Sequence, residues 1–380
     1  MKFTAAREAL LKPLQAVIGV VERRQTMPIL SNVLMIARDG QLSVTATDLE
    51  VELVAQADVD TESGGEITVS GRKLLDICRA LPEGTEINVS VSGEKLGVRA
   101  GRSKFSLATL PAAEFPVVED IKAGQSLSVS QETLGRLIEK THFSMAQQDV
   151  RYYLNGMLLE TSEGHLRAVA TDGHRLALSQ AGLEGKVDQQ QVIVPRKGVL
   201  ELQRLMTGDG DLNIEFGANH IRIQLEGIRF TSKLIDGRFP EYERVIPQES
   251  SNELKADRGA FKSALQRTAI LSNEKYRGIR LVIRDSGVIL QAHNPEQEEA
   301  EEELEVEYSG EDIEIGFNVN YLLDALGAVD GDEVTLSVQD SNSSCLIRQP
   351  GKDDCTFCLL YTSPSPRDQS LYLVCRLLLE

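Results

Sequence analysis

The sequence lacks the features of a membrane or exported protein. Its 380 residues contain no uninterrupted apolar run of about 18 residues, the length that a transmembrane helix needs. The opening residues, Met1 to Ala5, do not show the basic and then apolar arrangement of a secretory signal peptide. We therefore expect a cytoplasmic protein.

Cysteine and histidine are both scarce. The five cysteines are scattered and odd in number, which favours reduced thiols over a disulfide framework. Cys355-x-x-Cys358 has no second pair that would complete a zinc site. The spacing of His142, His165, His220 and His293 suggests no ligand set either, so we predict neither a metal nor another cofactor.

Motifs of catalysis are also missing. The sequence has no nucleophile elbow, no phosphate-binding loop and no His-x-x-x-His pattern. Asp172 and His174 could be imagined as half of a catalytic triad, but on a strand two such residues merely share a face. We expect a protein that is not an enzyme, with a structural or peptide-binding role for His174.

What the sequence does contain is an internal repeat. Three pairs of short segments recur at one offset of 124 residues: Ala46-Thr47-Asp48 with Ala170-Thr171-Asp172, Arg72-Lys73 with Arg196-Lys197, and Phe115-Pro116 with Phe239-Pro240. Leu322-Leu323-Asp324 lies twice that offset after Leu74-Leu75-Asp76, which suggests a third copy. The chain therefore reads as three tandem domains, at residues 1–122, 123–248 and 249–358.

Each copy is predicted to contain two helices and many antiparallel strands. In the first copy the spacing predicts a helix through Leu10, Leu14 and Val17, a hairpin at Asp39-Gly40, and a second helix over 71–81. This content indicates an α+β unit whose helices cover one face of its sheets.

Residues 359–380 do not continue the pattern. They hold Ser363-Pro364-Ser365-Pro366 and then an apolar patch, Leu371 to Leu379, with no element left to complete. A frameshift or read-through into foreign sequence would produce such a break, and a genuine extra segment is the alternative.

Charge is distributed unevenly. The formal net charge of −18 argues against a protein that coats nucleic acid with its whole surface. Taken together, the predicted helices nevertheless carry net positive charge, although the helix over 132–140 is neutral and the one near Asp324 is slightly acidic. If they share one face, that face can meet a phosphate backbone while the acidic remainder limits indiscriminate binding. The alternative is that these basic residues merely solvate exposed helix faces.

Several segments resemble one known family. They are residues 143–156, 169–176, 194–198, 236–240, 270–275 and 294–302, and the likeness extends from Met1 to about Phe357. The chain resembles the bacterial DNA polymerase III beta subunit, the sliding clamp. The resemblance implies three clamp domains per chain, a head-to-tail homodimer ring lined by helices, and a processivity factor for DNA replication that encircles duplex DNA. A scaffold with no DNA in its hole remains the alternative.

The resemblance also implies DNA-binding residues, which are Arg24, Arg72, Lys73, Gln148, Tyr152, Tyr153, Arg196 and Lys197. Lys and Arg contacts to phosphates carry no sequence information, so neighbouring positions along a duplex are nearly equal in energy. The alternative for Tyr152 and Tyr153 is ordinary packing within a strand.

A partner-peptide groove between the second and third copies is implied as well. Its lining would be Leu154, Thr171, Gly173, His174, Arg175, Leu176, Pro240, Arg244, Val245, Asn318, Tyr321 and Ser344. The expected partners are the replicative polymerase catalytic subunit, the clamp loader, and other polymerases and repair proteins that carry a clamp-binding peptide. Family members complete this groove with their C-terminal residues, and this chain departs from them after Cys358.

The dimer interface implied by the resemblance combines opposite charges with apolar residues: Arg102, Lys104, Phe105, Ile270, Leu271, Glu296, Glu298, Glu299, Glu301 and Glu302. Opposite charges on the two ends of one chain favour head-to-tail closure.

Overall fold

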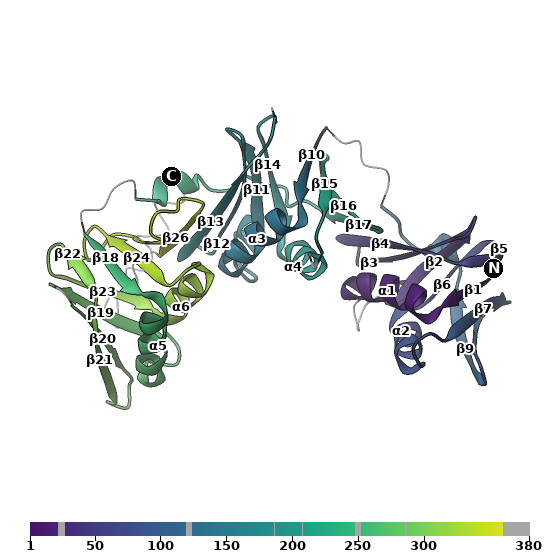
Figure 1. The fold of residues 1–380 in the computed structure, drawn as a ribbon, viewed down its shortest axis with the longest axis horizontal. Coiled ribbons are helices and arrows are strands. Elements are labelled where there is room, and N and C mark those ends of the chain that lie inside the picture. Colours follow the sequence, from purple (N-terminus) through teal and green to yellow (C-terminus); the bar gives the residue numbers. More distant parts are fainter. Residues whose placement is uncertain are drawn as a thin grey trace. The chain divides into compact units, whose positions relative to one another are not determined.

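The computed structural model describes residues 1–21, 27–118, 124–185, 187–206, 208–247, 252–285 and 287–359. The chain forms two compact units (Figure 1). Unit 1 comprises Met1–Leu134 and Lys197–Leu234, and unit 2 comprises Gly135–Arg196 and Ile235–Glu380. Among the described residues, no helix is long and apolar enough to cross a membrane.

Unit 1 is built on one antiparallel sheet. Across its described residues the strands lie in the order β10 (Gln125–Ser130), β15 (Asp211–Phe216), β16 (His220–Leu225), β17 (Ile228–Lys233), β4 (Val51–Asp58), β3 (Gln41–Thr47), β2 (Asn32–Arg38), β6 (Gly65–Ser70), β9 (Ser103–Leu110), β8 (Lys95–Ala100), β7 (Glu86–Ser92), β1 (Lys2–Ala6) and β5 (Asp60–Ser63). The predicted hairpin at Asp39-Gly40 is confirmed, because both residues adopt the positive φ that a tight turn between β2 and β3 requires.

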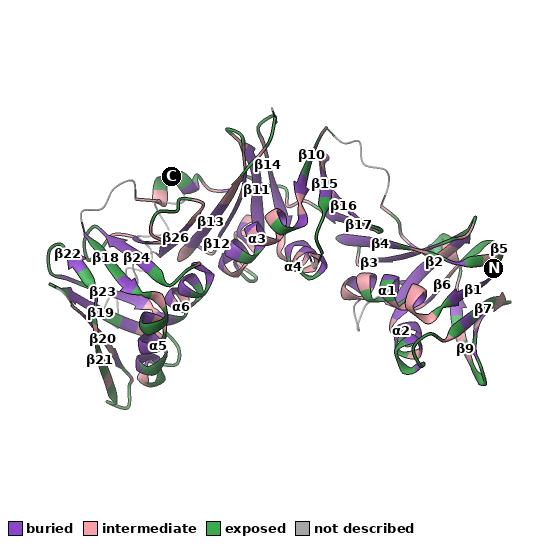
Figure 2. Cartoon of the chain, in the orientation of Figure 1, coloured by how far each residue is buried: buried purple, intermediate pink, exposed green. Residues whose placement is uncertain are grey.

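Two helices of the first copy pack together in unit 1. They are α1 (Arg7–Val17) and α2 (Gly71–Ala80). The first copy also contains the 3-10 turns η1 (Ile18–Val20), which follows α1 directly, η2 (Pro28–Ser31) and η3 (Ala112–Glu114). The apolar spacing seen in the sequence faces inward, because Leu10 and Leu14 of α1 and Leu74 of α2 are each about 1% exposed. Figure 2 shows buried segments alternating with intermediate and exposed ones along these helices.

The described residues of unit 2 form two antiparallel sheets. The larger has the order β14 (Gln190–Pro195), β11 (Gly156–Ser162), β12 (His165–Thr171), β13 (Arg175–Gly182), β26 (Cys355–Leu359), β25 (Cys345–Arg348), β24 (Glu333–Val338), β18 (Glu253–Asp257) and β22 (Glu307–Ser309). The smaller has the order β21 (Glu299–Glu305), β20 (Gly287–His293), β19 (Gly278–Arg284) and β23 (Ile313–Asn318).

The remaining helices belong to the second and third copies. They are α3 (Gln131–Thr141), α4 (Arg196–Leu205), α5 (Arg258–Thr268) and α6 (Val319–Ala328), with the 3-10 turns η4 (His142–Ser144), η5 (Tyr152–Asn155), η6 (Tyr242–Val245) and η7 (Ala269–Leu271). The fold class predicted from the sequence is confirmed: antiparallel sheets and two α-helices recur along the chain.

Successive copies are joined by strand pairing. In unit 1, β17 of the second copy pairs antiparallel with β4 of the first, with Phe230 opposite Leu53. In unit 2, β26 of the third copy pairs in the same way with β13 of the second, with Phe357 opposite Ala177. The strands β4 and β13 begin 124 residues apart, so both junctions use the same position in the repeat.

The last described strand includes Leu359, which is buried and lies opposite Arg175. Residues 360–380, the rest of the segment that breaks the sequence pattern, lie outside the described residues.

A left-handed residue marks the same turn in every copy. Leu49, Gly173 and Gln297 have φ of 78°, 86° and 65°, and they are spaced by the repeat offset. The tripeptide Ala-Thr-Asp precedes this residue in the first two copies, whereas Asn294-Pro295-Glu296 precedes it in the third. The turn is therefore a feature of the repeat that the sequence revealed only twice.

We predict that Gly173→Ala destabilises unit 2 by about 1–2 kcal/mol, because a residue with a Cβ is disfavoured at this left-handed φ. The added Cβ would also lie 2.9 Å from Nη2 of Arg151. The matched control is Leu49→Gly, which places glycine in the equivalent turn of unit 1 and should change stability by less than about 1 kcal/mol. Chemical denaturation measures both, and equal stability of the Gly173→Ala variant and the parent would contradict this view of the turn.

Candidate functional site

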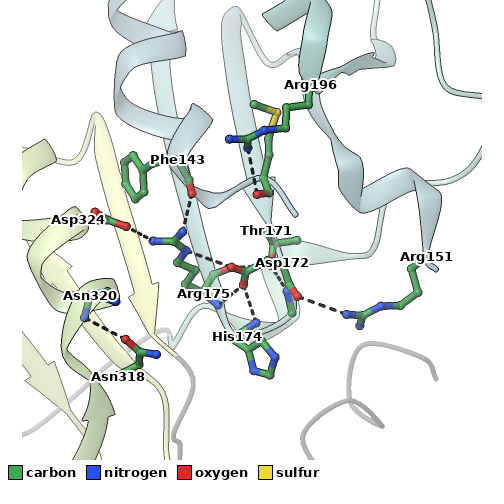
Figure 3. A network of polar contacts seen from close by, with 12 residues as sticks. Phe143, Arg151, Thr171, Asp172, His174, Arg175, Arg196, Asn318, Asn320 and Asp324 are labelled. Atoms are coloured by element: carbon green, nitrogen blue, oxygen red, sulfur yellow. Dashed lines mark hydrogen bonds and ion pairs between the residues drawn. The ribbon is translucent and has the colours of Figure 1, made fainter. Parts of the chain in front are cut away.

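The turn between β12 and β13 is organised by Thr171 and Asp172 (Figure 3). The Thr171 hydroxyl donates to the carbonyl of Arg175 at 2.7 Å and accepts from the N–H of Gly173 at 3.1 Å. Asp172 Oδ1 accepts from the N–H groups of His174 and Arg175 at 2.9 and 3.0 Å. The expectation that Asp172 and His174 share a strand was wrong, because both lie in this turn.

The first copy builds its turn from the same atoms. Thr47 donates to the carbonyl of Val51 at 2.9 Å, and Asp48 Oδ1 accepts from the N–H groups of Glu50 and Val51. The recurring tripeptide therefore stabilises a turn. With its carboxylate occupied by backbone and arginine donors, Asp172 is not arranged as a catalytic base.

Arg175 connects this turn to the third copy. Its guanidinium donates to Asp172 Oδ2 at 3.1 Å, to the carbonyl of Phe143 at 2.6 Å, and to Asp324 on α6. The same group lies 4.6 Å from the centre of the Tyr321 ring, a cation–π distance. Its side chain is only 12% exposed, so the arginine predicted to line a groove also holds two copies together.

His174 and Tyr321 form an aromatic surface beside Arg175. Their rings are stacked with centroids 6.4 Å apart, and both side chains are partly exposed. Burial raises the pKa of the Tyr321 hydroxyl, and the charge of Asp172 adds to the effect. A partly exposed stacked pair of this kind presents flat apolar area with polar edges, which suits binding of a peptide.

An apolar cluster lies beneath the other predicted groove residues. Leu176 belongs to it, and Val245 packs against it while remaining partly exposed. The buried members come from the second and third copies and the segment between them: Leu158, Val169, Leu176, Leu178, Ile193, Phe239, Tyr242, Leu346 and Cys358. Leu154 is also buried, whereas Pro240, Arg244, Asn318 and Ser344 keep some or much of their surface.

Cys358 is part of this apolar cluster and is fully buried. Burial raises the pKa of its thiol to about 11, which keeps the sulfur protonated. Cys355 sits three residues earlier on the same strand, so the two side chains point to opposite faces. The pair is therefore not arranged to hold one metal ion.

Arg151 is a site residue that the sequence reasoning missed. It donates to both carboxylate oxygens of Asp149 at 3.0 and 2.9 Å and reaches the carbonyl of Asp172 at 3.3 Å. It thereby fixes the loop of residues 147–151 to the Thr171–Arg175 turn (Figure 3). The Asp-x-Arg spacing was the only signal in the sequence.

The loop that Arg151 fixes and the η5 turn that follows it carry three of the predicted DNA contacts. Gln148 is exposed with a φ of 57°, and Tyr152 is 58% exposed. Tyr153 is half-buried against the apolar cluster around Leu176. The two tyrosines begin a 3-10 turn, so packing within a strand does not describe them. Arg24 lies outside the described residues.

The predicted contacts on helices differ in how far they are engaged within the chain. Lys73 of α2 is exposed, whereas Arg72 donates to the carbonyl of Val21 at 2.5 Å. Arg196 donates to the carbonyl of Met145 at 3.3 Å, and burial lowers the pKa of its guanidinium. Lys197 forms an ion pair with Asp48, whose other oxygen caps the first-copy turn.

The basic residues of α3, whose charges are balanced in the sequence by Glu132 and Glu139, do not form an open charged face. Lys140 is 5% exposed and donates to the carbonyl of Ala328 and to Asp330. Arg136 forms ion pairs with Asp330 and Asp354. Burial opposes its charge, but hydrogen bonds to both aspartates outweigh it and raise the pKa of the guanidinium. These cations bind the third copy within unit 2.

The predicted interface residues lie on or beside β21, which is an edge strand, and on or beside the first half of β9, which pairs with β8 alone. Arg102 and Lys104 at the start of β9 are exposed, and Phe105 is half-buried. Ile270 is 75% exposed on η7 beside β21, and Leu271 is half-buried. Glu296, Glu298, Glu299 and Glu301 are exposed, whereas Glu302 is paired with Arg267 of α5.

Comparison with protein-family models matches all three copies. Residues 1–119 match the N-terminal domain of the DNA polymerase III beta subunit, residues 128–241 its central domain, and residues 243–363 its C-terminal domain.

Curated relatives and solved structures agree with these matches. The beta sliding clamp of Pseudomonas putida is 55% identical over 363 residues, covering 95% of this chain and 99% of the relative. That of Escherichia coli K12 is 51% identical, with 95% and 99% covered. The Pseudomonas aeruginosa clamp bound to griselimycin superposes with a TM-score of 0.93 at 54% identity, covering 96% of this chain and 99% of that one. A Caulobacter crescentus clamp, with PEG bound to a putative beta-motif tethering region, superposes with a TM-score of 0.92 at 40% identity, covering 96% and 99%.

Three clamp domains, matched along nearly the whole chain, place this protein in the DNA polymerase III beta subunit family: it is a DNA sliding clamp, a non-catalytic subunit of a DNA polymerase holoenzyme.

Proposed function

We propose that two copies of this chain close head to tail into a ring around duplex DNA in the cytoplasm, and that the ring tethers the replicative polymerase and other partners through a peptide-binding groove. The observation that carries the proposal is the repeated strand junction. Two such junctions form among the described residues. The two strands that would form a third junction are present but do not pair with each other there.

The repeat identifies those strands. The counterpart of β4 and β13 in the third copy is β21, and the counterpart of β17 in the first copy is β9. Within the described residues, β21 pairs only with β20, and Ser103–Ala108 of β9 pair only with β8. An unpaired edge offers backbone N–H and C=O groups to another strand. A second copy can supply the missing partner at each edge, which is the arrangement of a closed head-to-tail dimer.

Charge supports the pairing of β9 with β21 across two chains. β21 exposes Glu299, Glu301 and Glu303, whereas Arg102 and Lys104 are exposed at the start of β9. Two acidic β21 edges would repel each other, so the same charges disfavour pairing of like edges. Ile270 adds exposed apolar surface beside the acidic strand.

DNA would be held by contacts to its phosphates. Lys73, Gln148 and Tyr152 are the best supported of the proposed contacts, because their side chains are exposed. Arg72, Arg196 and Lys197 remain in the proposal but already bind groups within the chain. Tyr153 and Arg24 complete the set.

Such contacts read no bases, so the ring slides, and enclosure rather than tight binding keeps it on the duplex.

Partners would bind where the second and third copies meet. Leu154, Thr171, Gly173, Arg175 and Leu176 form the buried or part-buried base of this surface. The more accessible members are His174, Pro240, Arg244, Val245, Asn318, Tyr321 and Ser344. The tethering region named for the Caulobacter crescentus clamp supports a peptide site in this chain, and the clamp loader and repair proteins would compete for it. An affinity near micromolar, about −8 kcal/mol, suits exchange of partners.

We predict that the protein, loaded on nicked circular duplex by its clamp loader, stays on the DNA until the circle is linearised. Gel filtration of labelled protein with the DNA measures retention. Arg102→Glu combined with Lys104→Glu should shorten retention on the circle, because two acidic edges then face each other. Reversing Glu299 and Glu301 to Lys in that variant should restore it.

Equal loss of the parent protein from circular and linear DNA would contradict the ring. If the parent is retained and the charge-reversed variant is retained equally well, the strands β9 and β21 do not close it.

We also predict that Val245→Asp weakens binding of the replicative polymerase catalytic subunit about tenfold or more, because a carboxylate then enters an apolar contact. Val117→Asp, at a residue 62% exposed in unit 1, makes the same change outside the unit that contains the proposed groove and should leave binding unchanged. Surface plasmon resonance measures both variants. Similar affinities for the two would remove Val245 from the site.

A further inference from the structure

The loop before β19 repeats the construction of the loop before η5. Asn273 lies 124 residues after Asp149, and each uses its side-chain oxygen to accept backbone N–H groups of the residues that follow. Asn273 Oδ1 accepts from Lys275 and Tyr276 at 2.9 and 3.0 Å, and Asp149 Oδ1 accepts from Arg151 at 2.8 Å. The third copy thus carries a structural counterpart of the loop that displays Tyr152.

Tyr276 occupies the position of Tyr152 in this repeat. Its side chain is 62% exposed, compared with 58% for Tyr152, and both are among the most exposed large apolar side chains of the described residues. The backbone beneath it is fixed, since Asn318 Nδ2 donates to the Tyr276 carbonyl at 3.2 Å and the Arg277 N–H donates to the Asn273 carbonyl at 2.8 Å. A well-anchored loop therefore holds an aromatic ring in solvent.

Lys275 differs from its counterpart in the way its charge is used. In the second copy the equivalent residue is Arg151, whose guanidinium is bound by the carboxylate of Asp149. The third copy has neutral Asn273 in place of that aspartate. Among the described residues Lys275 forms no salt bridge, and its Nζ lies 5.2 Å from the centre of the Tyr276 ring. The cation at this position is therefore bound within the second copy, whereas in the third copy it lies exposed beside an exposed aromatic ring.

We infer that Lys275 and Tyr276 form a further nucleic-acid contact, which binds the phosphodiester backbone of the enclosed duplex. The inference rests on the proposed ring and adds a third-copy loop to its contacts. A compact ammonium beside an exposed ring suits sequence-independent contact with a phosphate and its sugar. Lys275 and Arg277 outnumber Glu274 in the loop, so the local charge favours a polyanion.

The test measures equilibrium binding of a fluorescent duplex of about 30 base pairs across a salt series by anisotropy, using the full chain. Lys275→Gln should lower the slope of log affinity against log salt by about 0.9 for each phosphate that the side chain no longer neutralises, and affinity at low salt should fall about threefold to tenfold. Tyr276→Ala should weaken binding, while Tyr276→Phe keeps the ring and should retain it. The matched control is Lys352→Gln, an exposed lysine in the β25–β26 turn, with the parent slope expected.

The outcomes separate this inference from the proposed ring. Parent-like slopes for Lys275→Gln, in a variant that still dimerises by sedimentation velocity, would overturn the inference and leave the ring standing. A loss of polymerase binding with an unchanged DNA slope would also overturn it, because the loop would then serve a protein partner. If the parent is not retained on circular DNA, the proposed ring itself fails.

Discussion

Backbone hydrogen bonding between strand edges is the constraint on which this molecule depends. A strand at the edge of a sheet has N–H and C=O groups that only another strand can satisfy in register. Each copy has one strand that can pair with the following copy and one strand that can pair with the preceding copy. Within the chain, β4 receives β17 and β13 receives β26, so two junctions are internal. With three copies in the chain, β9 and β21 are left without a partner from a neighbouring copy. Their opposite charges favour pairing with the corresponding strands of a second chain.

The side chains around each internal junction reinforce the strand pairing in related ways. At the first junction, Asp48 of the turn binds Lys197 of α4. At the second, Arg175 beside the turn binds Asp324 of α6 and stacks with Tyr321, which lies 124 residues after Lys197. The same position on the following helix thus meets the same turn in both junctions, with different chemistry. Because Arg175 is engaged in this way, the proposed peptide surface and the second junction share residues, and partner binding relies on the integrity of the junction.

The repeat was visible in the sequence because Ala-Thr-Asp acts locally. The Thr and Asp side chains form hydrogen bonds with the backbone of a tight turn, and few other residues can do so. The helices over 71–81 and near 196–206 were predictable for a similar reason, since their buried residues follow the helical period. The corresponding turn of the third copy was missed because it does not contain the tripeptide. There Asn294 Oδ1 accepts a hydrogen bond from the N–H of Glu298 instead.

The use of individual charges was not predictable from the sequence. Lys140 reads as one more basic helix residue, yet it is buried against Asp330, which lies 190 residues away. Arg72 likewise reads as a free cation but is bound by the carbonyl of Val21. Such assignments depend on which elements meet in three dimensions, and periodicity within one helix carries no information about them. The distinction between Arg151, bound internally, and Lys275, displayed, required the same knowledge.

Amide hydrogen exchange followed by mass spectrometry, over a range of protein concentrations, tests the strand-edge account most directly. If β9 and β21 pair between two chains, the amides of Ser103–Ala108 and Glu299–Glu305 that face away from β8 and β20 are protected at high concentration and lose protection together on dilution, while β4 and β17 stay protected. Rapid exchange in both segments at every concentration would contradict the account.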